Sequence, residues 1–260
     1  MRAHSTLVVM RHGESTWTDP SVNRFAGWVD VPLTERGRAQ AAHAGDLLKG
    51  AGLRPEACFT SLLRRSIVTA DIVLDAAERL WVPVERTWRL NERHYGAFQG
   101  QTRPAMRERY GEELFSACRR GHDVRPPLIS LDSPYYQGSD ERYRPDGLDG
   151  TDPSQVRGES LADVETRVRP WWERCLLPRL SGSTTLLVVT HGSVARALRG
   201  MLEGLDAQSA ARLDVPTGVP LTYELECDGE GGWRLIGPGT YLDPDAAKEG
   251  IRAARDLGRI

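Results

Sequence analysis

Short apolar runs and amphipathic stretches alternate along this chain. Leu7 to Met10 is a run of four apolar residues, two of them β-branched, and residues 184–190 form a second run of similar character. Runs of this length and composition predict strands buried in an α/β sheet. Shorter segments predict further strands at 57–60, at 81–84 and, as a hairpin turning at Asp228 and Gly229, at 221–227 and 233–236.

Between these strands, apolar residues recur at the spacing of helices. The clearest helix starts are a potential N-cap at Thr34 and the pair formed by Ser160 and Asp163. Three of the predicted helices cover 39–49, 104–118 and 194–202. A fourth is capped by Ser61 and has an apolar stripe from Leu63 to Ala77, and a fifth begins at Ser160.

Two segments interrupt this alternation. Residues 125–158 are rich in Pro, Gly, Asp, Ser and Tyr and show no steady period. We expect them to form a long, loop-rich excursion that is mobile or ordered by a ligand. Residues 243–260 form a polar tail with a weak helical pattern, which we also expect to be mobile.

Composition narrows the class of protein. A hydrophobic content of 40% and a charged content of 27% are those of a soluble globular protein, and no run approaches the ~18 apolar residues of a membrane span. The net charge of −2 leaves no broad basic face for nucleic acid. Four cysteines without a CxxC pair argue against a metal site or a disulfide framework. With no signal-peptide pattern at the N-terminus, these features predict a cytoplasmic protein.

Both long strands are followed by a His-Gly pair. His12 and Gly13 follow the first strand, with Arg11 before them, and His191 and Gly192 follow the later one. Ligands of α/β sheets bind at the carboxyl ends of strands, so two such strands can bring two imidazoles together. A lone His at a strand end is usually a structural residue, but the doubling and the adjoining arginine favour a binding site.

The residue types at this sheet edge suit phosphoryl transfer. A neutral imidazole is a good nucleophile, and cations from Arg11 and Arg65 would keep His12 deprotonated while neutralising phosphoryl oxygens. The helix opened by Gly192 adds backbone N–H groups that attract an anion. Glu92 is the best-placed donor of a proton to the leaving oxygen. We expect no metal, because the neighbouring arginines would repel one.

These residues belong to a longer pattern. Arg11 to Ser15 resembles the signature of the histidine phosphatase superfamily, and in particular of its cofactor-dependent phosphoglycerate mutases. The likeness continues in order through Asn23-Arg24-Phe25 with Gly27-Trp28, Thr60-Ser61 with Arg65, Leu90 to Gly96, Arg119 to Gly121, His191-Gly192 and Pro216 to Pro220.

The resemblance implies a single phosphoglycerate-mutase-like domain over residues 1–260, with three α/β/α layers and a mostly parallel central sheet. It also implies 2,3-bisphosphoglycerate as the priming phosphoryl donor, a homodimer or homotetramer, and a C-terminal tail that closes over the site. The implied catalytic residues are His12, which carries the phosphoryl group, Glu92 as proton donor and acceptor, and His191, Arg11 and Arg65 as the phosphate pocket. The implied substrate contacts are Ser15, Thr18, Arg24, Ala26, Gly27, Arg93, Tyr95, Arg103, Arg119, Arg120, Gly192 and Ser193.

Four positions depart from the mutase pattern and keep alternatives open. Thr18, Ala26, Arg103 and Ser193 stand where the mutases usually have Asn, Thr, Lys and Asn. The substrate is therefore a small phosphorylated carboxylate if the protein is a mutase. It is another phosphate monoester if the protein is a phosphatase that uses the same phosphohistidine. A catalytically silent, anion-sensing binding protein is a third hypothesis, although such proteins tend to lose the nucleophile or the acid.

Overall fold

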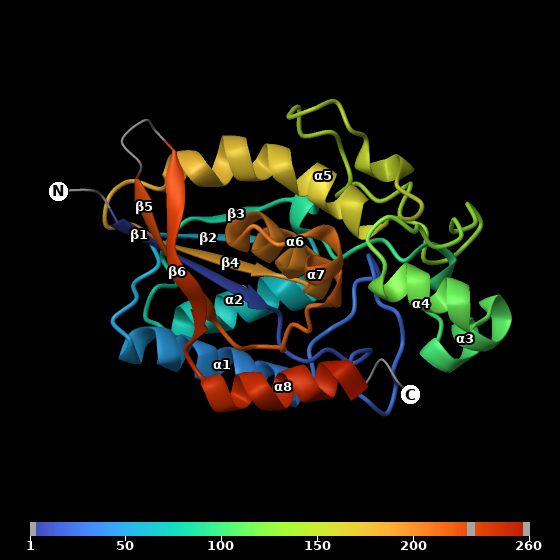
Figure 1. The fold of residues 1–260 in the computed structure, drawn as a ribbon, viewed down its shortest axis with the longest axis horizontal. Coiled ribbons are helices and arrows are strands. Elements are labelled where there is room, and N and C mark those ends of the chain that lie inside the picture. The colour runs from blue at the N-terminus through green and yellow to red at the C-terminus, as the bar shows by residue number, and fades with distance from the viewer. Residues whose placement is uncertain (1–3, 228–231, 257–260) are drawn as a thin grey trace.

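The computed structural model describes residues 4–227 and 232–256, and a single six-stranded sheet lies at its centre (Figure 1). The strand order is β3-β2-β4-β1-β5-β6. The four strands from β3 to β1 run parallel, and β5 and β6 extend the sheet in antiparallel fashion, so the mostly parallel sheet is confirmed. The strands are β1 (His4–Arg11), β2 (Ala57–Thr60), β3 (Val84–Arg86), β4 (Thr185–Thr190), β5 (Leu221–Cys227) and β6 (Trp233–Tyr241).

Helices cover both faces of the sheet, which confirms the three-layer α/β/α arrangement. Figure 1 shows α1 and α2 on one face and α5 and α6 on the other, with α3 and α4 beyond the carboxyl ends of the parallel strands. The helices are α1 (Glu35–Gly50), α2 (Arg64–Ala76), α3 (Arg103–Tyr110), α4 (Glu112–Arg120), α5 (Leu161–Trp171), α6 (Gly192–Glu203), α7 (Ala207–Arg212) and α8 (Pro244–Asp256).

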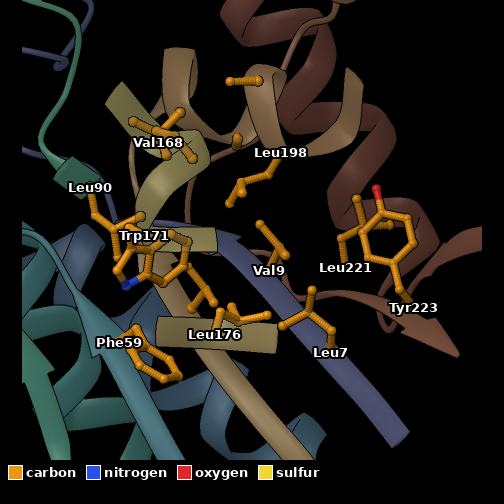
Figure 2. Close-up of a cluster of buried hydrophobic side chains, with 14 of the residues drawn as sticks. Leu7, Val9, Phe59, Leu90, Val168, Trp171, Leu176, Leu198, Leu221 and Tyr223 are labelled. Atoms are coloured by element: carbon orange, nitrogen blue, oxygen red, sulfur yellow. The ribbon is translucent and has the colours of Figure 1, made fainter. Parts of the chain in front are cut away.

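Alternate residues of β1 point into two separate cores. Leu7 and Val9 pack with residues of α5 and α6, whereas Val8 and Met10 pack with residues of α1 and α2. Figure 2 shows the first of these clusters, in which Trp171 of α5 lies edge-on to a phenylalanine of β2. Because β1 is buried on both faces, its carboxyl end is held firmly in the middle of the molecule.

Two predicted helix starts are confirmed by their hydrogen bonds. The Thr34 side chain accepts a hydrogen bond from the Gly37 amide at the start of α1. At the start of α5, Ser160 and Asp163 form a complete capping box in which each side chain bonds the other's backbone amide. Such caps satisfy amide groups that a helix leaves unpaired at its first turn.

The prediction of one helix over 104–118 is wrong. The chain divides there into α3 and α4 at Gly111, whose φ of 79° and ψ of 157° lie in a region that is essentially restricted to glycine. The two short helices then fold back on each other around Phe115, Met106 and neighbouring apolar side chains.

Two boundaries near β2 also differ from the prediction. The strand expected at 81–84 lies at Val84–Arg86, because Trp81 is 74% exposed with the Arg79 guanidinium over its ring. Ser61 does not occupy the N-cap of α2, a position that belongs to Leu63 and has no side-chain cap. The hydroxyl of Ser61 instead faces the end of β4.

The excursion over 125–158 consists of turns and one short 3-10 helix, η3 (Pro153–Gln155). Tyr143 stacks on Trp28, and His94 Nε2 donates to the Gln137 side-chain oxygen over 3.0 Å, so buried contacts attach the excursion to the main body. At the C-terminus, α8 lies beside α1 (Figure 1). The predicted turn at 228–229 and residues 257–260 lie outside the described part of the chain. None of the helices described is long and apolar enough to span a bilayer.

Candidate active site

Two histidines follow neighbouring strands at one edge of the sheet. β1 and β4 pair in parallel with Arg11 opposite Thr190, and the His12 amide donates to the Thr190 carbonyl over 2.9 Å. His12 and His191 therefore leave the sheet at the same level, and their ring centroids lie 4.9 Å apart. Both side chains are buried. The sheet register itself thus brings the two imidazoles together.

The turn after His12 passes directly against the start of α1. A Cβ atom on Gly13 would lie 2.2 Å from the Gly37 carbonyl oxygen, and one on Gly37 would lie 2.0 Å from the Glu14 carbonyl oxygen. A side chain at either position would push the turn away from the helix. These two glycines therefore determine how His12 enters the site.

The hydrogen bonds of His12 define its tautomer. Nδ1 lies 2.6 Å from the Gly13 carbonyl oxygen, which can only accept, so Nδ1 carries the proton. Nε2 accepts a hydrogen bond from Arg65 Nε over 3.2 Å. Burial, followed by the charges of Arg65 and Arg11, holds the pKa of His12 well below its ordinary value. Nε2 is therefore an unprotonated nucleophile at neutral pH.

Backbone carbonyls hold Arg65 in this orientation. Its Nη1 donates to Val29 over 2.9 Å and its Nη2 donates to Gly27 over 2.7 Å. Burial lowers the pKa of Arg65 to about 10, so the guanidinium stays charged at neutral pH. Gly27, expected to contact the substrate, thus acts through its carbonyl oxygen on Arg65.

Glu92 accepts three backbone hydrogen bonds. Oε1 accepts from the amides of Arg93 at 2.8 Å and Ser193 at 3.0 Å, and Oε2 accepts from the Gly192 amide at 3.2 Å. Burial alone would raise the pKa of Glu92, but the Arg93 amide, the charge of Arg11 and the start of α6 outweigh it and lower the pKa. The free site therefore holds an ionised carboxylate, ready to accept a proton.

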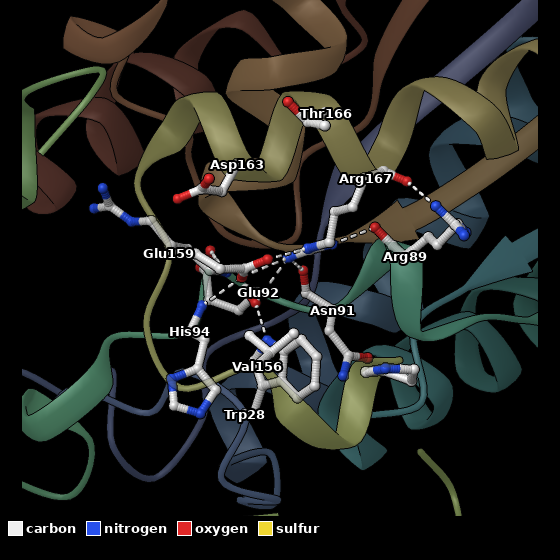
Figure 3. Close-up of polar contacts among 12 residues, drawn as sticks. Trp28, Arg89, Asn91, Glu92, His94, Val156, Glu159, Asp163, Thr166 and Arg167 are labelled. Atoms are coloured by element: carbon white, nitrogen blue, oxygen red, sulfur yellow. Dashed lines mark hydrogen bonds and ion pairs between the residues drawn. The ribbon is translucent and has the colours of Figure 1, made fainter. Parts of the chain in front are cut away.

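A buried ion pair supports the segment that carries Glu92 (Figure 3). Arg167 of α5 pairs with Glu159 at 2.6 Å, and its Nη2 also donates to the carbonyl oxygens of Asn91 at 2.8 Å and Glu92 at 3.1 Å. Trp28 donates its indole N–H to the same Glu92 carbonyl over 2.6 Å. Hydrogen bonds from Arg167 and from Trp28 to the backbone around Glu92 thus hold the catalytic carboxylate in place.

A cavity of about 70 Å³ opens beside these groups, and arginine is the commonest residue in its lining. Eight of the residues predicted for the site line it: Arg11, Glu92, Tyr95, Arg103, Arg119, Arg120, Gly192 and Ser193. Two charged residues there were missed. Arg196 lies one helical turn after Gly192, a spacing that could have revealed it, whereas Asp214 carries no sequence signal. Asp214 pairs with Arg120 at 2.8 Å and with Arg255 of α8 at 3.4 Å.

Other predicted substrate contacts lie outside this cavity. Arg24 donates to the Gly100 carbonyl over 2.7 Å, and the Thr18 hydroxyl bonds Ser15. Ala26 is buried. Arg93 donates to the Arg119 carbonyl over 3.2 Å and lies over the Tyr95 ring. In this structure none of these side chains lines the cavity.

Several buried nitrogens near the cavity lack a hydrogen-bond partner within residues 4–227 and 232–256. They are Arg11 Nε, His191 Nδ1, Arg93 Nε and Arg103 Nε. Three of the four belong to cations, so the residues present fit an anionic ligand. Within the same residues, no cluster of three or more His, Cys, Asp or Glu side chains has the arrangement of a metal site.

Stability should fall as the pH drops below about 6.5, the ordinary pKa of histidine. Burial is the largest cause of the lowered pKa values of His12, His191 and His94. His122 opposes them, because the hydrogen bonds that it donates to the carboxylates of Glu165 and Asp123 outweigh burial and raise its pKa. As the pH falls below about 6.5, the three buried rings take up protons in the unfolded chain but not in the folded one, and His122 alone of these four shows the opposite preference.

Each ring with a lowered pKa then costs up to about 1.4 kcal/mol of stability per pH unit. Urea unfolding measured at pH 7.5, 6.5 and 5.5 tests this expectation, with His12→Asn showing a shallower dependence than the unmodified chain. A free energy of unfolding that stays constant from pH 7.5 to 5.5 would contradict buried, neutral rings.

The chain matches known proteins along nearly its whole length. The sequence model of the histidine phosphatase superfamily (branch 1) matches residues 7–135 and 135–236. The 2,3-bisphosphoglycerate-dependent phosphoglycerate mutase of Corynebacterium jeikeium (strain K411) is 45% identical over 259 residues, which are 99% of this chain and 97% of that protein. The protein of the same name from Thermobifida fusca (strain YX) is 46% identical over 257 residues, covering 98% of this chain and 100% of that one.

A solved structure adds a second activity to the comparison. The mycobacterial glucosyl-3-phosphoglycerate phosphatase in complex with VO3 aligns with a TM-score of 0.64 and 26% sequence identity. The alignment covers 90% of this chain and 98% of that chain.

Proposed function

The chain belongs to the histidine phosphatase superfamily, and we propose that it interconverts 2- and 3-phosphoglycerate through a phosphohistidine at His12. The observation that carries this proposal is the state of His12, whose Nε2 is unprotonated and bonds Arg65 and whose ring lies 4.9 Å from the second imidazole. The mutase activity named for the two relatives, at 45% and 46% identity, supports the choice of reaction.

The proposed roles follow from the hydrogen bonds. The phosphoryl group is bound to His12 Nε2, and Arg65 and Arg11 neutralise its oxygens. As a substrate hydroxyl attacks the phosphorus, the Glu92 carboxylate takes the hydroxyl proton. The Nε2–P bond then breaks, and its electron pair returns to the imidazole.

In the second half of the reaction the roles reverse. His12 Nε2 attacks the other phosphate of the bound sugar acid, and the P–O bond breaks. Glu92 gives its proton to the leaving oxygen and returns to the carboxylate form in which the free site holds it. One carboxyl group thus serves as base and then as acid, and no net proton is consumed.

The second anionic end of the substrate is proposed to bind in the cationic cavity. Arg103, Arg119 and Arg120 line it, and Arg103 Nε has no partner within the described chain. A volume of about 70 Å³ supports a small substrate with two anionic groups over a bulky phosphate ester.

2,3-Bisphosphoglycerate, the cofactor in the names of the relatives, would supply the phosphoryl group that first occupies Nε2. Arg11 and Arg65 would hold its reacting phosphate, and the arginines of the cavity would hold its other anionic groups. The proposal also places the protein in the cytoplasm, where free thiols such as its four cysteines persist.

The second candidate is a phosphatase that transfers the phosphoryl group from His12 to water. The 26% identical phosphatase structure favours it, as do Ala26 and Ser193, which stand where the mutases usually have longer polar side chains. The anion-sensing hypothesis is disfavoured, because His12, Glu92 and the phosphate pocket are all present.

Purified protein supplied with 3-phosphoglycerate tests the proposal. We expect 2-phosphoglycerate to form, and to form faster after addition of a trace of 2,3-bisphosphoglycerate. Free phosphate released in parallel from a panel of phosphate monoesters measures the phosphatase alternative. If phosphate is released from one of these esters faster than 2-phosphoglycerate forms from 3-phosphoglycerate, the mutase assignment is overturned and the phosphatase is supported.

A further inference from the structure

Ser61 lies directly behind the second imidazole of the site. Its side chain is fully buried at the end of β2, and its Oγ lies 2.8 Å from His191 Nε2. The same oxygen accepts a hydrogen bond from the Leu63 amide over 3.1 Å. Ser61 and His191 lie 130 positions apart in the sequence, so this contact is created by the pairing of β2 with β4.

Counting protons around this hydroxyl determines the direction of its bond to the ring. Ser61 has one proton to donate, and His191 Nε2 is the only acceptor that the described residues offer it. If Nε2 carried the proton instead, the buried Ser61 proton would have no acceptor, which is costly. The hydroxyl therefore donates to Nε2, and Nε2 is unprotonated.

The remaining proton of His191 must then lie on Nδ1. Burial, followed by the charges of Arg65 and Arg11, keeps this ring neutral at pH 7, so it carries one proton only. Nδ1 is itself buried and has no hydrogen-bond partner within the described chain. The ring faces His12 at 4.9 Å between centroids. An unpaired N–H group thus lies on the ring that neighbours the nucleophile, and a phosphoryl oxygen could accept a hydrogen bond from it.

We propose that Ser61 is a positioning residue that fixes the Nδ1–H tautomer of His191, so that this ring donates a hydrogen bond to the transferred phosphoryl group. The inference deepens the proposed function, since it rests on a phosphoryl group at His12. The opposite tautomer would direct a lone pair at an anion and would repel it.

The tautomer can be measured on the free protein, without any substrate. In protein labelled with ¹⁵N-histidine, we expect His191 Nδ1 to be protonated and Nε2 to be unprotonated at pH 7. In Ser61→Ala the constraint is lost, and the Nε2–H form should become populated. A wild-type ring protonated at Nε2, or an unchanged tautomer in Ser61→Ala, would overturn the proposal.

Activity provides the second arm. Ser61→Ala should lower kcat by about 10²-fold, because a donor to the developing charge is lost, and Ser61→Thr should restore both the rate and the tautomer. Ser66→Ala is the matched control. Ser66 is another buried serine, which donates to the Val189 carbonyl over 2.5 Å on the same strand β4. It should lower stability comparably, with kcat and the tautomer unchanged.

The two arms separate this inference from the proposed function. If the protein proves to be a phosphatase, the tautomer measurement stands, and the rate arm is read from phosphate release. A loss of rate in Ser66→Ala equal to that in Ser61→Ala would assign Ser61 a merely structural role and overturn the proposal.

Discussion

Replacing His12 with alanine should abolish phosphoryl transfer, lowering kcat by roughly 10⁵-fold or more, as removal of a covalent nucleophile does elsewhere. Within the described chain, His12 Nε2 is the nitrogen that combines a free lone pair with an adjacent guanidinium. The neighbouring ring cannot replace it, because its Nε2 bonds Ser61. The loss should therefore affect mutase and phosphatase turnover alike.

The measurement follows both turnover and the covalent intermediate. The unmodified protein should take up acid-labile, alkali-stable phosphate from a labelled phosphoglycerate, and His12→Ala should take up none. His4→Ala is the control, since His4 begins the same strand β1 and its side chain is 56% exposed. Turnover retained in His12→Ala would remove His12 from the role of nucleophile.

The regular part of the fold was predictable because burial there follows a simple period. The two-faced burial of β1 appears in the sequence as a continuous apolar run, and the capping residues Thr34 and Ser160 are local signals. The break at Gly111 was not predictable from such signals. A glycine costs a helix only about 1 kcal/mol, so a continuing apolar period still predicts one helix. The positive φ of Gly111, which ends the helix, is visible only in the structure.

The exposed position of Trp81 shows a second limit of the apolar pattern. An aromatic ring in an apolar run suggests burial, yet here the exposed Trp81 ring lies against the guanidinium of the buried Arg79. β3 therefore begins three residues later than expected.

The sequence predicted which segments meet at the site, but it did not predict where each side chain points. Strand-end histidines meet because register is set by the sheet. The orientation of Arg24 toward the Gly100 carbonyl depends on a segment 76 positions away. Contacts such as that between Asp214 and Arg120 join segments 94 positions apart, and no local pattern encodes them.

Replacing Arg167 with methionine should lower the free energy of unfolding by about 3–5 kcal/mol. The pair that it forms with Glu159 is buried on both sides, with each side chain only 5% exposed. Its removal leaves a carboxylate in the interior whose remaining hydrogen-bond partner among the described residues is the His94 amide, at 2.8 Å. It also removes one donor from the carbonyl oxygens of Asn91 and Glu92, so kcat should fall as the catalytic carboxylate loses its fixed position.

Urea unfolding and kcat measured on the same samples separate stability from positioning. Arg125→Met is the control, because Arg125 forms a bidentate pair with Asp163 on the same helix but is 63% exposed. Its loss should cost less than about 1 kcal/mol and leave kcat unchanged. In Arg167→Met with Glu159→Met, much of the stability should return because no charge is left buried, whereas kcat should stay low. A cost below 1 kcal/mol for Arg167→Met, or full activity in the double variant, would show that this network does not hold Glu92 in place.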